Sequence, residues 1–363
     1  IYTVMNCIPT PSIETSFMAN ANTGFIKISR FSATTYDEFM EAVAALKKQG
    51  MENLILDLRG NPGGYLDAAT MLADEFLPDK KLIVYTEGKA RPRKNYYATE
   101  KGDFEKGKVF VLIDEGSASA SEILAGALQD WDRAEIIGRR SFGKGLVQEQ
   151  TLFPDGSAMR LTVARYYTPT GRSIQKPYKN GYMAYEEEVY DRYKHGEMVN
   201  ADSTHFNDSL KYTTPGGKIV YGGGGIMPDL FIPIDTTSDN EFARSVFGLG
   251  LVSRFSYDYT DKHRNKLNTF KSIDDYIKGF SADQRLLSDF FVYAIDNKVR
   301  PDEKSIQASK QLIANQLKAN IGRLLFGNDA FYRVVLSDDK AFNAALQQAE
   351  STVQSKVKES EMR

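Results

Sequence analysis

Short apolar runs alternate with amphipathic segments between residues 23 and 235, and this alternation constrains the fold more than any other feature of the chain. Residues 24–28, 54–58 and 108–113 have the length and composition of buried strands. Amphipathic stretches such as residues 120–130 follow them at helical spacing. Strands that alternate with helices are typical of an α/β fold. We therefore predict an α/β core over residues 23–235.

Further elements of this core follow from capping residues and turns. A helix is expected to begin at Thr34 or Thr35 and to end at Gly50, and a second one covers about residues 67–76. Residues 134–137 read as a strand. A hairpin follows, with strands 147–153 and 157–167 around the turn Pro154-Asp155-Gly156. The apolar face of the first helix comprises Phe39, Ala42, Val43 and Leu46.

The chain outside this alternation falls into three parts. Residues 1–22 are expected to be a linker or the end of a preceding segment, and residues 180–220 a polar, Tyr-rich excursion from the core. Residues 239–363 are predicted to form a helical C-terminal region. Its clearest helix is 302–326, with Gly327 just past its end. The apolar stripe of that helix comprises Ile313, Leu317, Ile321 and Leu324.

Composition excludes several classes of function. The 363 residues carry 46 basic and 48 acidic side chains, a net charge of −2, so no field of one sign favours nucleic acid or an anionic membrane. Cys7 is the only cysteine, which rules out an internal disulfide. No apolar run approaches the roughly 18 residues of a membrane helix. Because the chain starts at Ile1 instead of Met, we expect that an upstream portion has been removed.

A serine-rich turn is the first candidate for chemistry. Residues 116–122, GSASASE, link a buried strand to a helix, and a nucleophile there would have backbone N–H groups beside it for an oxyanion. Ser119 and Glu122 also have the spacing of a capping box. On these residues alone the capping role is favoured over the nucleophile, although one serine can serve both.

A serine nucleophile needs a base, and lysine is the better candidate here. His195, His205 and His263 lie in the polar excursion or the helical tail, where we expect surface positions. They lack the helical spacing of metal ligands, so no metal site is predicted. Lys144 stands between two glycines and apolar residues, and the next acid is Glu149. Such surroundings can hold an uncharged amine.

Two glycine-rich stretches resemble nucleotide-binding motifs without meeting their requirements. Residues 138–144 fit the pattern G-x-x-x-x-G-K after a strand. A phosphate loop then needs Ser or Thr and a helix, whereas Gly145 and a hairpin strand follow here. Nucleotide binding is kept as a weak alternative. Gly222–Gly225 is expected to be a flexible turn.

Four motifs together resemble the carboxyl-terminal processing, or tail-specific, serine protease family. They are LILDLRGNPGG (54–64), GSASASEILAGALQD (116–130), GKGLVQ (143–148) and GGGGIMPD (222–229), in order within residues 20–235. The resemblance implies a crotonase-like (Clp protease-like) core of strand-strand-helix units and a Ser-Lys dyad without a cofactor. It also implies cleavage of protein substrates near a free C-terminus, in the bacterial periplasm or cell envelope.

The family's functional residues map onto these motifs. The resemblance makes Ser119 the nucleophile, in preference to Ser117 and Ser121, and Lys144 the base. Gln148 matches a residue that orients the lysine. In a plain strand Lys144 and Gln148 would be about 13 Å apart, so a bend near the flanking glycines is expected.

The oxyanion would be held by backbone N–H groups. The resemblance points to Ala120 and Gly64 as donors, with Gly63 the other candidate in its turn. Members usually carry a PDZ domain before the core, and the chain before residue 23 is too short for one. We therefore expect weak activity and little preference for a free C-terminus from this chain alone. Its helical tail could pair subunits in a homo-oligomer.

Two other functions remain open on the same fold. The first is a catalytically silent protein that binds peptides or serves as a scaffold. The second is an acyl-CoA enzyme, since crotonase-like cores also serve that chemistry. The presence of Ser119, Lys144 and Gln148 disfavours the former, and the protease motifs disfavour the latter.

Overall fold

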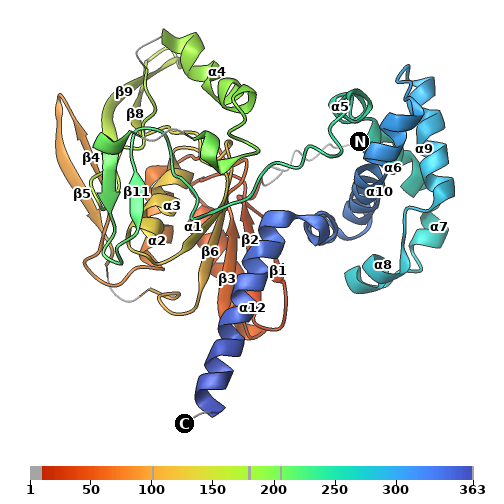
Figure 1. Ribbon diagram of the computed structural model, residues 1–363, viewed down its shortest axis with the longest axis horizontal. Coiled ribbons are helices and arrows are strands. Elements are labelled where there is room, and N and C mark those ends of the chain that lie inside the picture. The colour runs from red at the N-terminus through yellow and green to blue at the C-terminus, as the bar shows by residue number, and fades with distance from the viewer. Residues whose placement is uncertain (1–9, 100–101, 179–180, 205–206, 362–363) are drawn as a thin grey trace. The chain divides into compact units, whose positions relative to one another are not determined.

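The computed structural model describes residues 10–99, 102–178, 181–204 and 207–361, so the predictions on Cys7 and His205 lie outside the described residues. The chain forms two compact units. The first contains the described residues up to Pro233 together with those from Ala344 onward, and the second is Ile234–Asn343. Figure 1 labels their helices and strands. No described helix has the length and apolar character needed to cross a bilayer.

A six-stranded sheet forms the centre of the first unit, in the order β1-β2-β3-β6-β7-β12. Only the edge strand β1 runs antiparallel to its neighbour, and the other pairs are parallel. Every residue of β2, β3 and β6 is buried, as expected where helices cover both faces of a parallel sheet. The bounds are β1 Ile13–Met18, β2 Thr23–Ile28, β3 Asn53–Asp57, β6 Val109–Ile113, β7 Glu135–Gly138 and β12 Leu230–Phe231.

Three helices pack their apolar faces on this sheet and complete the core. They are α1 (Thr35–Lys48), α2 (Leu66–Asp74) and α3 (Ala120–Asp130). The four predicted apolar residues of α1 are all buried. Helix α3 is buried along its entire length, which explains its small residues, because a Cβ on Gly126 would lie 2.9 Å from Thr168. The α/β class predicted from the sequence is thus confirmed.

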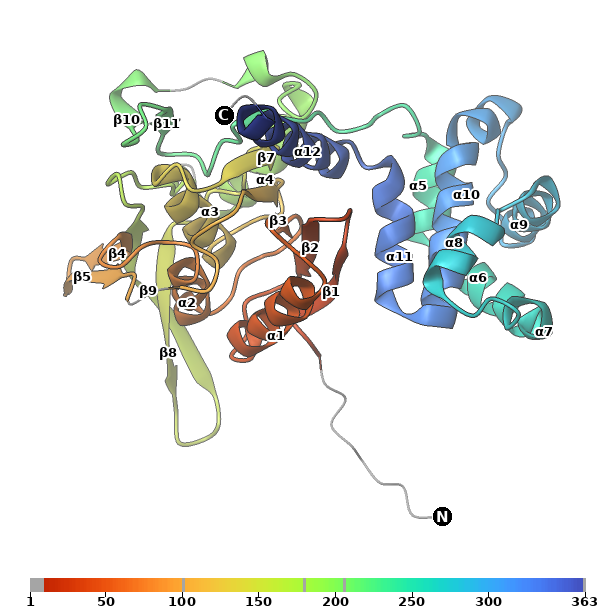
Figure 2. The same cartoon turned by 90° about the horizontal axis from the view of Figure 1, so that it is seen from below.

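A second sheet of four strands, in the order β5-β4-β9-β8, lies in the same unit. Its strands are β4 Leu82–Gly88, β5 Arg91–Tyr97, β8 Leu146–Leu152 and β9 Ala158–Tyr167. The hairpin β8–β9 matches the predicted one and extends away from the helices, as Figure 2 shows. Strands β4 and β5 were not anticipated. β5 is almost wholly exposed, so its sequence has no apolar alternation.

The predicted polar excursion contains more regular structure than its sequence suggested. Helix α4 (Gly181–Lys194) is followed by the short strands β10 (Lys211–Thr213) and β11 (Ile219–Tyr221), which pair with each other. Only Tyr185 and Arg192 of α4 are buried. An apolar stripe is therefore missing, and the helix could not be recognised from periodicity.

The second unit is helical. Its elements are α5 Glu241–Gly248, α6 Leu251–Lys262, α7 Arg264–Leu267, α8 Ile273–Gly279, α9 Gln284–Asp296, α10 Glu303–Phe326 and α11 Asn328–Val335. The last helix, α12 (Lys340–Glu361), begins here, but from Ala344 it belongs to the first unit, where Gln348 donates to Glu135 Oε1 at 2.7 Å. The predicted helical region 239–363 is thus shared between the two units.

Helix α10 carries the core of the second unit. Ile313, Leu317 and Ile321 are fully buried, as their spacing predicted. The expectation for Leu324 is wrong, because its side chain is 44% exposed. At 3.6 residues per turn the stripe drifts around the helix, and the neighbouring Leu325 packs on the core instead.

Leu317→Ala should therefore lower the free energy of unfolding of the second unit by about 2–5 kcal/mol, since it leaves a cavity. Far-UV circular dichroism in urea would measure the loss of helix. Fluorescence of Trp131, the only tryptophan, follows the first unit separately. Leu324→Ala is the matched control on the same helix. An equal effect of both substitutions would contradict this description of the core.

Candidate active site

All five residues proposed from the sequence line one cavity of the first unit. This cavity of about 650 Å³ lies between the turn that contains Gly64, the start of α3 and the hairpin β8–β9. We call it the active-site cavity. Ser119, Ala120, Lys144 and Gln148 line it together with that turn.

Ser119 occupies a strained turn between β6 and α3. Its φ of 55° and ψ of −112° lie outside the regions that a residue with a Cβ ordinarily adopts. Such strain is concentrated at functional sites, and a sharp strand-to-helix turn that exposes a serine is typical of hydrolase nucleophiles.

The predicted capping box is present. The Ser119 N–H donates to Glu122 Oε2 at 2.9 Å, and the Ser119 side chain is placed to accept from the Glu122 N–H, which also donates to the Ser119 carbonyl at 2.9 Å. Ser119 therefore occupies the cap position and also lines the active-site cavity.

The neighbouring serines are fully buried and engaged in structural hydrogen bonds. Ser117 donates to the Leu58 carbonyl at 2.8 Å, and Ser121 donates to the Asn61 carbonyl at 3.0 Å. Both bonds tie the serine turn to the turn at residues 58–64. The geometry therefore favours Ser119 over its neighbours as the nucleophile.

Lys144 lies in a loop directly before β8, and hydrogen bonds to side chains hold the backbone of this loop. Its N–H donates to Glu122 Oε2 at 2.8 Å, and the N–H groups on either side donate to Glu122 Oε1 at 2.7 Å and to Gln175 Oε1 at 2.8 Å. Gly143, directly before Lys144, has a φ of 88°, in the left-handed region that favours glycine. No helix follows, so the phosphate-loop reading fails here as the sequence indicated.

The Glu122 carboxylate joins the two candidate catalytic residues. It is fully buried and accepts hydrogen bonds from the N–H groups of Ser119, Gly143 and Lys144 and from the Ser141 hydroxyl. Burial raises its pKa, and these four donors oppose that shift. The capping-box pattern identified Glu122 but gave no hint of its contacts to the lysine loop.

Tyr166 makes a second bridge that sequence reasoning missed. Its buried hydroxyl lies 3.0 Å from the Ser119 carbonyl and 2.5 Å from the Lys144 carbonyl. Burial raises the pKa of this phenol well above its usual value, so it stays a donor. No motif marks this tyrosine, since its function depends on the pairing of β9 with distant segments.

Gln148 lies on β8 and is exposed. The β8–β9 register shifts between Val147 and Gln148, and both Gln148 and Lys144 line the active-site cavity. Among the hydrogen bonds of the described residues none involves the Gln148 amide. Its role in orienting the lysine stays a prediction.

The turn at residues 60–64 supplies one clear candidate for the oxyanion hole. The Gly63 N–H donates to Asn61 Oδ1 at 2.9 Å and is therefore occupied. Within the described structure neither the Gly64 N–H nor the Ala120 N–H has an acceptor, and Ala120 opens α3, where no intrahelical acceptor exists. Gly63 is needed for close approach, because a Cβ there would lie 2.6 Å from the Ala118 carbonyl oxygen.

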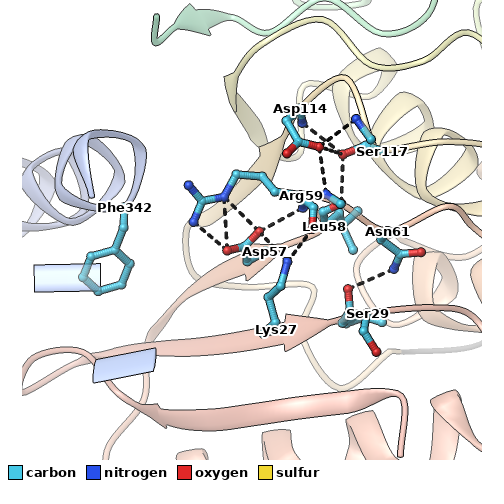
Figure 3. A network of polar contacts seen from close by, with 12 residues as sticks. Lys27, Ser29, Asp57, Leu58, Arg59, Asn61, Asp114, Ser117 and Phe342 are labelled. Carbon is cyan, nitrogen blue, oxygen red and sulfur yellow. Dashed lines mark hydrogen bonds and ion pairs between the residues drawn. The ribbon is translucent and has the colours of Figure 1, made fainter. Parts of the chain in front are cut away.

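A buried ionic cluster holds the start of this turn, as Figure 3 shows. Asp57, at the end of β3, binds Lys27 Nζ at 3.2 Å and the Arg59 guanidinium at 2.7 Å. Its Oδ1 also accepts the Arg59 N–H at 2.9 Å, and Lys27 donates to the Arg59 carbonyl. Burial favours the neutral acid, but Arg59 and Lys27 outweigh it and lower the pKa of Asp57 to about 2.

The rest of the turn is held by side-chain amide and carboxylate groups (Figure 3). Asn61 donates to the Ile28 carbonyl at 3.0 Å, in addition to accepting from Gly63. Asp114 Oδ1 accepts the Gly60 N–H at 2.8 Å. These hydrogen bonds of Asn61 and Asp114 fix the turn in the conformation that leaves the Gly64 N–H without an acceptor.

Comparison with known proteins finds family matches for two parts of the chain. Residues 22–181 match the family described as peptidase family S41. Residues 242–327 match a family of unknown function (DUF8443).

Curated relatives of the S41 segment carry consistent names. The "Carboxyl-terminal-processing protease" of Synechocystis sp. is 37% identical over 203 residues, 56% of this chain and 46% of the relative. The "Carboxy-terminal-processing protease" of Bartonella bacilliformis is 38% identical over 228 residues, 61% of this chain and 51% of the relative. The chain thus spans about half the length of these relatives.

Among solved structures, the photosystem II D1 C-terminal processing protease is 34% identical to this chain with a TM-score of 0.41. The alignment covers 46% of each chain.

Asp57→Asn should remove a pH-dependent part of the stability of the first unit. A carboxyl whose pKa falls to about 2 on folding stabilises the protein above its unfolded pKa, and this stabilisation is lost as pH falls from about 4 to 2. The loss should be about 2 kcal/mol in wild type and absent in the variant, which is also less stable at neutral pH. Urea unfolding followed by Trp131 fluorescence measures both quantities.

The control is Asp79→Asn at an exposed ion pair, which should leave the stability at neutral pH within about 0.5 kcal/mol of wild type. An unchanged acid profile in Asp57→Asn would refute the assignment of this charge.

Proposed function

We propose that this protein is a serine endopeptidase that cleaves protein substrates near their C-termini through a Ser119–Lys144 dyad. One observation carries the proposal. A single cavity brings together a serine in a strained turn, a lysine in a pinned loop and two backbone N–H groups without acceptors. The match of residues 22–181 to peptidase family S41 supports this chemistry.

The reaction divides into acylation and deacylation. The Lys144 amine takes the Ser119 proton as Oγ attacks the peptide carbonyl, and the Gly64 and Ala120 N–H groups bind the oxyanion. The carbon–nitrogen bond then breaks, and the lysine ammonium protonates the leaving amine. Water attacks the ester with Lys144 again as base, which frees the new carboxylate and restores Ser119. Gln148 is assigned to orienting the amine.

Substrate preference and location belong to the proposal for the whole protein. Several relatives are named carboxyl-terminal processing proteases, which supports a substrate with a free C-terminus. A periplasmic or cell-envelope location, the crotonase-like description and homo-oligomer formation stay predictions. Among the described residues no three His, Cys, Asp or Glu side chains cluster as metal ligands.

Ser119→Ala should lose nearly all hydrolysis of an unstructured protein because the nucleophile is gone, and it should stay folded because loss of a helix cap costs only about 1 kcal/mol. Lys144→Ala and Lys144→Arg should be equally inactive, since a guanidinium stays protonated. Gel-based proteolysis with circular dichroism measures both properties. Ser117→Ala is the matched control in the same turn.

Two outcomes would overturn the proposal. Substantial hydrolysis by Ser119→Ala or Lys144→Arg removes the dyad. A wild-type protein that binds peptides without cleaving them is the silent scaffold that the fold also allows.

A further inference from the structure

A second, larger cavity adjoins the active-site cavity in the first unit. Its volume is about 1390 Å³, and Lys144, Leu146 and Gln148 line both cavities. The start of β8 is therefore their common wall. A ligand that extends across Lys144 can occupy both at once.

Described residues of the polar excursion (180–220) build one wall of this second cavity. Tyr182, Tyr185 and Leu210 belong to that wall, and the lining also includes Lys89 on the β4–β5 turn and Thr162 on β9. Most of the excursion lies beyond the segment that matches peptidase family S41. Most of the cavity lining, including its residues on β4, β8 and β9, lies within the matched segment, and the excursion adds Tyr182, Tyr185, Glu186, Leu210 and Tyr212 to it.

Ionic contacts fix this wall to the lysine loop. Arg140 binds Glu197 at 2.6 Å and Glu188 at 3.3 Å. From α4, Arg192 donates to the carbonyls of Ser141 and Arg140 at 3.0 and 2.7 Å. Because the same loop continues into Lys144, these contacts hold the wall and the backbone of the candidate base in fixed positions relative to each other.

The lining indicates what the second cavity can bind. Charges of both signs are present, and Glu87 lies opposite Arg165 in the β4–β9 register. Tyrosine dominates, and its flat ring gives a large contact area with little loss of side-chain entropy. The tyrosines that line the cavity are Tyr167, Tyr178, Tyr182, Tyr185 and Tyr212.

We infer that this second cavity binds the stretch of substrate chain next to the scissile bond and selects large aromatic or aliphatic side chains there. The inference rests on the proposed peptidase function. The volume exceeds the 300–1,000 Å³ that is usual for small-molecule sites, and the cavity opens to the place where a peptide would be attacked. An extended polypeptide satisfies both conditions.

Tyr182 provides the sharpest test. Cleavage sites in an unstructured protein are mapped by mass spectrometry. Peptides that contain one of these cleavage sites are then synthesised. Each carries Phe or Ala at the second, third or fourth residue on one side of the scissile bond. Wild type should prefer Phe by about tenfold in kcat/KM on one side, and Tyr182→Ala should abolish most of that preference. Tyr182→Phe, which retains the ring, should keep it.

Tyr190→Ala is the matched control. Tyr182 and Tyr190 lie on the same helix and are 62% and 60% exposed, but only Tyr182 lines the cavity. Binding of the same labelled peptides to Ser119→Ala, followed by fluorescence anisotropy, repeats the comparison without turnover. The inference is wrong if Phe and Ala peptides behave alike on both sides, or if Tyr182→Ala and Tyr190→Ala are indistinguishable.

These outcomes are separate from a failure of the proposed function. An active enzyme that ignores these side chains refutes the inference alone. Full activity in Ser119→Ala refutes the dyad, whatever the side-chain preference.

Discussion

The buried Glu122 carboxylate is the interaction on which the candidate site depends. Ser119 and Lys144 lie on separate segments, whose loops share one direct backbone hydrogen bond, from the Phe142 N–H to the Ser117 carbonyl at 2.9 Å. Glu122 accepts N–H groups from both loops, and the opposing carbonyls of Ser119 and Lys144 meet at the Tyr166 hydroxyl. The Glu122 carboxylate thus accepts the N–H groups of the two loops, and the Tyr166 hydroxyl binds their carbonyls. A buried charge is costly, and here four donors offset that cost.

The turn at residues 60–64, on the other side of the cavity, is fixed by a different buried charge. Asp57 ends a strand whose residues are all buried, so its carboxylate is stable there only with Lys27 and Arg59 beside it. The cluster sets the direction of the chain toward Gly63 and Gly64. Preorganised N–H donors stabilise a developing oxyanion because no reorganisation is needed during the reaction. The charges at Asp57 and Glu122 therefore prepare opposite sides of one cavity.

Much of this fold was predictable from the sequence because it obeys simple periodicities. Helix α3 begins and ends where its capping residue and apolar pattern placed it, and β3 and β6 are buried runs between turns. Helix α4 was missed because ion pairs, rather than an apolar stripe, hold it. The motifs identified Ser119 and Lys144, whose chemistry restricts the residue type. The role of Tyr166 and the contacts of Glu122 to the lysine loop could not be predicted from the sequence, because they depend on which distant backbone atoms meet in space.

The same division between local and tertiary constraints bears on substrate selection. The proposed catalytic residues lie in short motifs within the segment that matches peptidase family S41. The residues of the second cavity are drawn from β4, β9 and the excursion, and they share a tyrosine-rich character without a common motif. A surface for recognising a polypeptide needs area and shape more than any one group in an exact position, so its residues leave little trace in sequence. Because the excursion is attached to the loop of Lys144 by Arg140 and Arg192, a change in this wall can alter selectivity without displacing the nucleophile, which lies at the start of a separate helix.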